Sequence, residues 1–327
     1  MASLHQNHID IDFVFTWVNG NDPLHQEKIN SYIDPDKKKN KKSNDARFKQ
    51  VNEIEFAVHS ILKNAPFVRT IFIVTDQQTP DFLKNPDLQN IERYKKVKIV
   101  EHKEIFRDYE KYLPTFNART IETFLYRIPG LAEHFIYIND DFFILNPVQT
   151  EDFFQNGFPV LRGKWLAFEE NLIYKKILHF LHLKKENPAK AGHKIAQQKA
   201  AKIVGFTKYY KFHHTPHPMR KSTFENFSKL HTEYELNNIE HKFRSKLQYT
   251  PQGLANHLEI EQKTCVLKSN YQLVYFGSYD KPLWFLLLRL KWLSNMRSML
   301  FLNMQNLSAC PETKLHFLLQ WLRQRFD

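Results

Sequence analysis

Glycine and cysteine are scarce in this sequence, and each scarcity argues against a class of protein. Only eight of the 327 residues are glycine, and neither a Gly-x-Gly-x-x-Gly nor a Walker pattern occurs. This argues against a dinucleotide-binding enzyme and against a P-loop ATPase. The two cysteines, Cys265 and Cys310, are too few and too isolated for a disulfide framework or a zinc cluster, and they fit a reducing compartment.

Long apolar segments are also missing. Residues 1–12 lack a basic start followed by an apolar run, so we expect no secretory signal. The most apolar window, 283–293, contains Arg289 and Lys291 and falls short of the ~20 apolar residues that a spanning helix needs, so we expect no integral membrane protein. Its mixture of bulky apolar and basic residues leaves two interpretations: an interfacial helix in peripheral membrane contact, or a core helix with two snorkelling side chains.

The composition that remains is that of a globular protein, with 42% hydrophobic and 25% charged residues. The length suggests two domains, and we place a soft boundary that divides the chain into 1–163 and 164–327. Charge is distributed unevenly, because residues 1–160 carry 20 Lys and Arg against 23 Asp and Glu, whereas residues 161–327 carry 27 against 12. The second half is therefore expected to face something anionic: a phosphate-rich substrate, an acidic polymer, a membrane surface or a nucleic acid.

Strand-like and helix-like segments alternate in the first half. Runs rich in β-branched and aromatic residues predict parallel strands at 11–18, 69–75, 97–100 and 135–138. Apolar stripes at helical spacing predict helices near 51–61 and 121–128. We therefore expect an open, mostly parallel α/β sheet with its ligand site beyond the carboxyl ends of the strands. Beyond about residue 165 we expect lysine-rich, largely helical segments, a strand at 271–276, and helices near 283–300 and 313–325.

Polar residues follow the predicted strands, which makes them candidate ligands for a substrate or a metal ion. Asn19 and Asp22 follow the first strand, and Asn139, Asp140 and Asp141 follow the fourth. Adjacent carboxylates at such a position can bind Mg²⁺ or Mn²⁺ that also bridges phosphate oxygens. The alternative is an ordinary turn or helix cap.

Two further segments offer side chains for the same cleft. Asn117 is a candidate helix N-cap, and Glu122 then lies on the flank of that helix, where it either reaches the cleft or pairs with a neighbouring arginine. His217 stands between Pro216 and Pro218, which makes helix improbable there and predicts a stiff loop. A histidine so held can act as general base, although sixteen histidines are scattered through the chain.

Arginines are the remaining candidates for phosphate binding, since a guanidinium matches two oxygens at once. They are Arg47, Arg162, Arg220 and Arg244. Most arginines of a protein only solvate its surface, and the sequence alone leaves that interpretation open for each of these.

Taken in order, these motifs resemble the Stealth family of sugar-1-phosphate transferases. The segment from Ile11 through Thr-Trp17-Val-Asn-Gly-Asn-Asp22 looks like the family's first region. The second region is recognised from Asp45-Ala-Arg47-Phe, through Leu113-Pro-Thr-Phe-Asn117, to Asn139-Asp-Asp141-Phe. His214-Thr-Pro-His217-Pro, with Arg244 downstream, looks like the third. The fourth has Asn303 but Met304 where the family has Asp.

The resemblance implies a nucleotide-sugar-binding fold of the Rossmann-like or GT-A-like kind and an enzyme that forms phosphodiester linkages. It would move hexose-1-phosphate or N-acetylhexosamine-1-phosphate from a UDP-sugar to an acceptor sugar hydroxyl and release UMP. Glu122, Asp141, His217 and Arg244 would belong to the active site, with Asp140, Asp141 and Glu122 on Mg²⁺ or Mn²⁺. The resemblance also implies substrate-binding roles for another set of residues, namely Asn19, Asp22, Arg47, Asn117, Asn139, Arg162 and Asn303.

Partners and location follow from the same resemblance. We expect an oligosaccharide or polysaccharide acceptor linked by phosphodiesters, no nucleic acid, and a cytoplasmic protein in peripheral contact with the inner membrane or with capsule assembly machinery. Two rivals remain: a metal-dependent glycosyltransferase that releases UDP, and a basic nucleic-acid-binding protein. All of these expectations depend on acidic side chains and the His217 imidazole converging on one diphosphate.

Overall fold

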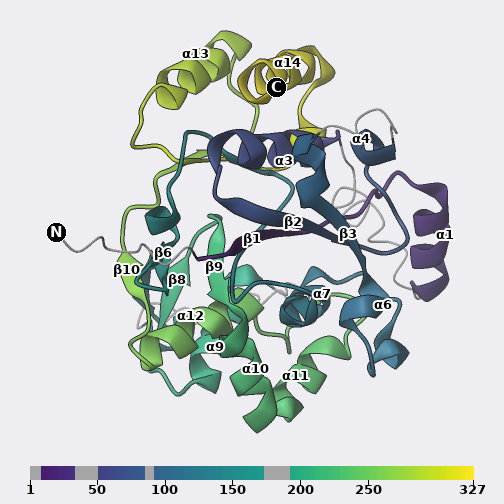
Figure 1. Ribbon diagram of the computed structural model, residues 1–327, viewed down its shortest axis with the longest axis vertical. Coiled ribbons are helices and arrows are strands. Elements are labelled where there is room, and N and C mark those ends of the chain that lie inside the picture. The colour runs from purple at the N-terminus through teal and green to yellow at the C-terminus, as the bar shows by residue number, and fades with distance from the viewer. Residues whose placement is uncertain (1–8, 34–50, 85–91, 173–191) are drawn as a thin grey trace, which may run out of the picture. The chain divides into compact units, whose positions relative to one another are not determined.

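A computed structural model describes residues 9–33, 51–84, 92–172 and 192–327 of the chain (Figure 1). The chain forms two compact units, each assembled from separate segments. The first unit comprises residues 1–9, 102–136 and 151–271, and the second comprises residues 10–101, 137–150 and 272–327. The predicted division after residue 163 falls inside strand β7 (Phe158–Ala167).

The second unit contains the predicted parallel sheet. Its strands β1 (Ile11–Thr16), β2 (Val68–Thr75) and β3 (Val97–Glu101) lie in the order β3-β2-β1, and both pairs are parallel. The apolar side chains on both faces of β1 and β2 are buried, as expected for a parallel sheet covered on each side. The end of β4 (His134–Ile138) continues the sheet beside β1. The predicted mixed α/β fold with a mostly parallel central sheet is therefore confirmed.

A buried charged residue interrupts the apolar run of β1. Asp12 of β1 is fully buried, and its carboxylate accepts hydrogen bonds from the Arg69 guanidinium at 2.9 and 2.5 Å and from the Thr70 backbone N–H at 3.1 Å. A buried carboxylate needs such partners because its desolvation is costly. This arrangement ties β1 to β2 at the point where the register of their pairing shifts, between Ile11 and Phe13.

Helices and a second, smaller sheet complete this unit. In the small sheet β11 (Leu273–Phe276) pairs parallel with β12 (Phe301–Met304), which pairs antiparallel with β5 (Phe142–Ile144). Apolar residues at helical spacing place α3 (Glu53–Asn64) against β2 and β5 (Figure 1). The other helices of the unit are α1 (Pro23–Tyr32), α4 (Asp81–Lys84), α13 (Leu283–Ser294) and α14 (Glu312–Phe326).

The first unit combines a four-stranded sheet with helices. Strand β7 pairs with β6 (Phe154–Gln155), β8 (Lys208–Phe212) and β10 (Val266–Lys268). The unit also contains β9 (His217–Arg220), α6 (His102–Ile105), α7 (Ala118–Thr123), α9 (His193–Ile203), α10 (Lys221–Leu230), α11 (Thr232–Ile239) and α12 (Pro251–Glu261). Its core contains a cluster formed by Ala200, Phe227, Tyr249 and Leu254.

The predicted strands are found as β1, β2, β3, β4 and β11, and the predicted C-terminal helices are found as α13, which ends already at Ser294, and α14. Strands β5, β6, β7 and β10 were not predicted, and further differences are as follows. The stripe near 121–128 is not one helix, because α7 ends at Thr123 and a single 3₁₀ turn, Leu125–Arg127, follows it. The lysine-rich part contains strands β8 and β9, which its composition did not predict. His217 was predicted to lie in a stiff loop, but it is the first residue of strand β9. Within the described part of the chain, no helix has the length and apolar character needed to cross a bilayer.

Candidate functional site

The acidic turn, residues Asn139-Asp140-Asp141, connects β4 to β5. It is tight, because the Phe142 backbone N–H donates to the Asn139 carbonyl at 3.2 Å. All three of its residues are half-buried. The prediction that these carboxylates follow the carboxyl end of a buried strand is confirmed, and this is the edge of an α/β sheet where ligands bind.

Strand β12 fixes the acidic turn from the other side. Asn303 is fully buried, and its Nδ2 donates to the Asp141 carbonyl at 3.1 Å. The backbone N–H of Met304 donates to the same carbonyl at 3.0 Å. The Met304 side chain is buried in the core, so the residue that departs from the family pattern contributes its backbone to the turn. The fourth motif, which contains Asn303 and Met304, therefore lies directly against the acidic turn that ends the second motif.

Three carboxyl groups of this unit have raised pKa values. Burial raises the pKa of Asp141 to about 6, while a hydrogen bond from Asn303 opposes the change. Burial, followed by the charges of Asp141 and Glu53, raises the pKa of Asp140 well above its usual value. Burial and the Asp141 charge also raise the pKa of Glu53. Clustered carboxyls with raised pKa values are typical of functional sites, because a bound cation relieves both the desolvation and the repulsion.

Sequence reasoning missed Glu53. The residue opens α3, where its Oε2 accepts a hydrogen bond from the Val51 N–H at 2.9 Å, and only 7% of its surface is exposed. Glutamate in the first turn of a helix is common, so its position gave no signal. A buried glutamate close to two aspartates became visible only from the fold.

The donor set of the acidic turn suits a hard divalent cation. Asp141 Oδ1 and Asn303 Oδ1 are buried oxygen atoms with no hydrogen-bond partner. Among the residues that the structure describes, no three His, Cys, Asp or Glu side chains lie close enough to hold a metal ion by themselves. Mg²⁺ typically binds one or two carboxylates and takes its other ligands from water and substrate phosphates, so the residues present fit such an ion.

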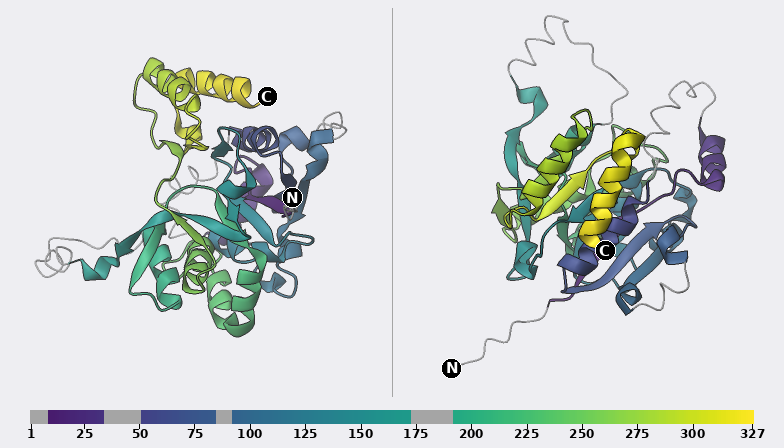
Figure 2. Two further views of the ribbon diagram at one scale, coloured as in Figure 1. Left: turned by 60° about the vertical axis from the view of Figure 1, so that its left-hand side comes forward. Right: turned by 90° about the horizontal axis from the view of Figure 1, so that it is seen from above.

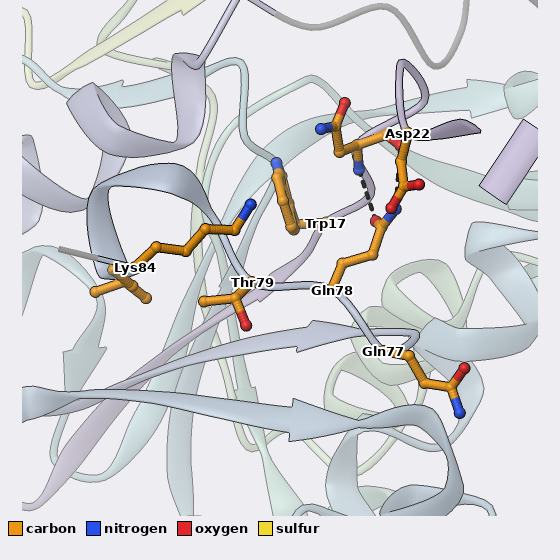
Figure 3. A pocket seen from close by; sticks show the side chains of 8 residues that line it. Trp17, Asp22, Gln77, Gln78, Thr79 and Lys84 are labelled. Carbon is orange, nitrogen blue, oxygen red and sulfur yellow. Dashed lines mark hydrogen bonds between the residues drawn. The ribbon is translucent and has the colours of Figure 1, made fainter. Parts of the chain in front are cut away.

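A pocket of about 470 Å³ lies beyond the carboxyl ends of β1 and β2 in the same unit. It is lined by Trp17, Asn19, Asp22, Gln77, Gln78, Thr79, Leu83 and Lys84. Figure 3 shows Trp17 in the middle, with Lys84 reaching towards it from one side, Gln78 and Asp22 on the other, and Gln77 pointing away. Its volume falls in the range of small-molecule sites.

Gln78 holds the pocket's two predicted substrate-binding residues in place. Its Oε1 accepts from the Asn19 backbone N–H at 2.8 Å, and its Nε2 donates to the Asn19 carbonyl at 3.1 Å and to Asp22 Oδ2 at 2.9 Å (Figure 3). The bond from Gln78 lowers the pKa of Asp22, which therefore stays ionised. Asp22 also caps α1 by accepting from the Leu24 N–H at 2.9 Å, and Pro23 opens that helix.

His217 belongs to a group of imidazoles in the first unit. Its ring meets the Phe212 ring edge-on at 4.8 Å, and Phe212 also contacts His193, whose ring stacks on that of His214 at 5.6 Å. Burial and these two neighbouring imidazoles lower the pKa of His217 to about 3. Burial and the Arg244 charge lower that of His214. These rings are therefore neutral near pH 7, and a neutral imidazole can accept a proton.

Arg244 stands on a loop that is tied to α7. The Phe116 backbone N–H donates to the Lys242 carbonyl at 2.9 Å, and the Phe243 ring stacks on Phe116 at 5.4 Å. The predicted N-cap role of Asn117 is confirmed: its Oδ1 accepts from the Arg119 N–H, while its Nδ2 donates to the His241 carbonyl and to Gln248 Oε1. Buried Asn117 thereby joins the second motif to the Arg244 loop, and Arg244 itself is exposed.

The remaining candidates have varied environments. Half-buried Glu122 lies on α7, in the same unit as Arg244 and His217. Burial lowers the pKa of Arg162 to about 10, so it remains charged at neutral pH. Arg220 makes a two-bond ion pair with buried Glu259 at 2.9 and 2.7 Å, which corrects its interpretation as a phosphate ligand. Arg47 lies outside the described residues.

The predicted site residues thus fall into two sets. The second unit brings together Asn139, Asp140, Asp141 and Asn303, and it carries Asn19 and Asp22 in the pocket. The first unit brings His217 into the imidazole group beside Arg244, with Asn117 and Glu122 on the adjoining α7. That both sets act on one diphosphate stays a prediction.

Comparison with protein families and curated proteins gives consistent matches. Residues 47–160 match Stealth protein CR2, conserved region 2, and residues 10–34 match Stealth protein CR1, conserved region 1. A capsular polysaccharide phosphotransferase of Actinobacillus suis is 47% identical over 153 residues, 45% of this chain and 39% of that protein. Capsular polysaccharide phosphotransferase LcbA of Aeromonas hydrophila is 34% identical over 229 residues, 68% of this chain and 57% of that protein.

A further relative and two solved structures extend the comparison. Exopolysaccharide phosphotransferase SCO6023 of Streptomyces coelicolor is 31% identical over 235 residues, 72% of this chain and 37% of that protein. The alignments with the first relatives therefore span about two fifths of their lengths. Galactosyltransferase LgtC, solved with donor and acceptor sugar analogs, aligns over 97% of this chain and 96% of its own at 9% identity and a TM-score of 0.45. For mouse xyloside xylosyltransferase 1 the coverages are 91% and 97%, at 11% identity and a TM-score of 0.40.

Proposed function

Because this chain carries the first two conserved regions of the Stealth proteins and belongs to that family, we propose that it is a capsular polysaccharide phosphotransferase. It transfers hexose-1-phosphate or N-acetylhexosamine-1-phosphate from a UDP-sugar to an acceptor sugar hydroxyl. The products are a phosphodiester linkage and UMP. The relatives are named capsular or exopolysaccharide phosphotransferases, which supports the reaction class.

The acidic turn is the observation that carries this proposal. A sugar nucleotide presents a diphosphate, and transfer at its phosphorus requires neutralised oxygens and aligned nucleophile and leaving group. Two carboxyls with raised pKa values at the end of a buried strand, one with an oxygen that has no hydrogen-bond partner, suit a cation that binds such a diphosphate. Mg²⁺ or Mn²⁺ bound by Asp140 and Asp141 would withdraw charge from the phosphate oxygens.

The side chains of the first unit supply the remaining chemistry in this proposal. The acceptor hydroxyl oxygen attacks the phosphorus next to the sugar, a new P–O bond forms, and the bond from this phosphorus to the bridging oxygen breaks. His217, neutral near pH 7, takes the hydroxyl proton. Arg244, Arg162 and Arg47 bind phosphate oxygens, which a guanidinium contacts in pairs. UMP leaves with the electrons of the broken bond.

We assign the nucleoside of the donor to the pocket beyond β1 and β2. Trp17 offers an aromatic surface, and the amide of Asn19 and the hydroxyl of Thr79 are groups that can pair with a base. Ionised Asp22 can accept hydrogen bonds from ribose hydroxyls. The acceptor in this proposal is a phosphodiester-linked saccharide, and the reaction takes place at the cytoplasmic side of the inner membrane, near capsule assembly machinery.

The products of the reaction test the proposal. Purified protein is incubated with a panel of UDP-sugars, Mg²⁺ and short oligosaccharide acceptors, and the products are examined by phosphorus NMR. A phosphodiester signal together with free UMP is the expected result. Release of UDP with no phosphorus in the new linkage would instead identify a metal-dependent glycosyltransferase, and the absence of turnover with every donor would reject both.

A further inference from the structure

Helix α13 (Leu283–Ser294) is apolar nearly all round, although it lies at the surface of the second unit. Every residue except Arg289, Lys291 and Ser294 is apolar. A helix of this composition is normally buried on all sides in a large core or in a membrane. Figures 1 and 2 show α13 next to α14, with one side of α13 turned away from the rest of the unit.

Burial divides α13 into two faces. Leu286, Leu290 and Ser294, at spacings of four residues, are buried against the unit. The outer face, defined here as Trp284, Phe285, Leu288 and Trp292, is exposed by 64, 41, 57 and 67%. Because residues at i, i+4 and i+8 lie along one side of a helix, the two tryptophans stand near the two ends of one continuous apolar stripe. A continuous apolar patch of this kind marks an interaction surface.

The charges of α13 and of its flanking residues are mostly positive, although exposed Asp280 lies just before Lys281. Residues 281–297 contain Lys281, Arg289, Lys291 and Arg297 and no acidic residue. Lys281, Lys291 and Arg297 are exposed. Lys314 of α14 adds another cation at the start of α13, where its Nζ donates to the carbonyls of Tyr279 and Lys281 at 2.7 and 3.0 Å. The surface that covers the outer face should therefore be anionic.

We propose that the outer face of α13 docks on the surface of an anionic phospholipid bilayer. Tryptophan prefers the boundary between headgroups and acyl chains, and lysine and arginine reach from such a helix to the lipid phosphates. Together they supply apolar burial and attraction to anionic lipid. A protein partner or a second copy of this chain fits less well, because lysine is depleted in protein interfaces and a predominantly basic rim repels its own copy.

The binding test uses the full chain and vesicles of stated composition. In flotation with phosphatidylcholine vesicles containing 30% phosphatidylglycerol, the parent protein should float, and it should bind pure phosphatidylcholine vesicles several-fold more weakly. The triple variant Trp284→Gln, Leu288→Gln, Trp292→Gln should bind the anionic vesicles at least tenfold more weakly. The matched control Leu230→Gln, Leu247→Gln changes leucines of similar exposure elsewhere and should bind like the parent.

Tryptophan fluorescence then reports which face is inserted. Brominated lipids should quench the emission of the parent, and the variant Trp284→Phe, Trp292→Phe should lose most of that quenching. The variant Lys281→Gln, Lys291→Gln, Arg297→Gln should lose the preference for anionic vesicles. Circular dichroism melting establishes that each variant folds.

Three outcomes would overturn the proposal. They are absence of vesicle binding by the parent, equal binding by the folded triple variant, and a parent dimer without vesicle affinity that the triple variant converts to a monomer. None of these measurements depends on donor turnover, so this proposal and the proposed reaction can fail independently.

Discussion

His217 is the residue for which the family resemblance and the geometry make the sharpest catalytic prediction. Its ring is held against Phe212 beside His193 and His214, and its lowered pKa keeps it neutral at pH 7. His217→Ala should therefore lower kcat by about 10² to 10⁴-fold, the usual contribution of a general base. The dissociation constant of the UDP-sugar, measured by calorimetry without acceptor, should stay near that of the parent.

A histidine of the same segment provides the control. His213 is exposed and packs edge-on against Tyr271 at 4.7 Å, so His213→Ala should leave turnover nearly unchanged. Turnover of His217→Ala close to the parent rate would remove His217 from the mechanism.

The raised pKa of Asp141 leads to a prediction of how cation binding depends on pH. Its pKa of about 6 in the folded protein exceeds the ~3.9 of an unfolded chain, so the folded state binds this proton more tightly. Through this group, lowering the pH from 7 to 5 stabilises the metal-free protein, whereas Mg²⁺ stabilises only the ionised form. The increase in melting temperature caused by Mg²⁺ should therefore be large at pH 7.5 and small at pH 5.

Two substitutions separate this effect from general salt effects. Asp141→Asn should remove both the Mg²⁺-dependent increase and the Mg²⁺-dependent turnover. Asp280→Asn, an exposed change in the same unit, should keep both. An Asp141→Asn protein that responds to Mg²⁺ like the parent would show that the cation binds elsewhere.

At the level of elements, the sequence predicts what depends on local pattern. β1, β2, β3 and β4 lie where runs of β-branched and aromatic residues predict them, because those runs must be buried on both faces. Helix α7 is shorter than the apolar stripe from which a helix near 121–128 was predicted. Phe124 already leaves the helical conformation, before Ile128 and Pro129.

Contacts between distant segments could not be predicted in this way. Glu53 reaches the acidic turn because α3 packs on β5, and Asn303 reaches it because β12 pairs with β5. Glu53 has no local signal of its role, and only the family's fourth motif pointed to Asn303. The buried Met304 shows that a departure from the motif can keep the backbone contact.

Asn303 links β12 to the acidic turn, which makes it a test of positioning. Asn303→Ala removes the donor to the Asp141 carbonyl and should lower the free energy of unfolding by about 1–2 kcal/mol, measured in urea. Since the Asn303 bond also lowers the pKa of Asp141, the pH midpoint of the Mg²⁺ effect should move upwards. Asn295→Ala, an exposed change in the same unit, should alter neither, and an unchanged midpoint in Asn303→Ala would leave Asn303 a purely structural role.

Gln78 connects the segment after β2 with the segment after β1, so it should act on donor binding. Gln78→Ala removes the bonds that hold Asn19 and Asp22, and KM for the UDP-sugar should rise by about 10-fold or more, the effect of losing buried hydrogen bonds, while kcat changes little. Gln77→Asn changes a side chain that points away from the pocket and should leave KM unchanged (Figure 3). An equal loss in kcat with constant KM would argue that the pocket does not bind the donor.

At the scale of the whole molecule, charge separates the two units less sharply than it separates the halves of the chain, but one unit is still clearly more basic. The first unit carries 25 Lys and Arg against 16 Asp and Glu, whereas the second carries 22 against 19. The excess of positive charge therefore accompanies His217 and Arg244, and the unit with the acidic turn is nearly balanced. A growing phosphodiester polymer has one negative charge per repeat, so the first unit is suited to bind it.

This distribution predicts that elongation depends on salt in a particular way. At about 0.1 M salt the screening length is ~10 Å, so contacts between exposed lysines and successive phosphodiesters weaken steeply as salt rises further. Raising NaCl from 50 to 200 mM should increase KM for an acceptor of several repeats by several-fold, whereas a neutral acceptor of one unit should be nearly insensitive. The comparison is made at constant UDP-sugar and Mg²⁺, so that screening at the donor site affects both acceptors alike. Equal salt dependence for the two acceptors would mean that the basic unit contributes nothing to polymer binding.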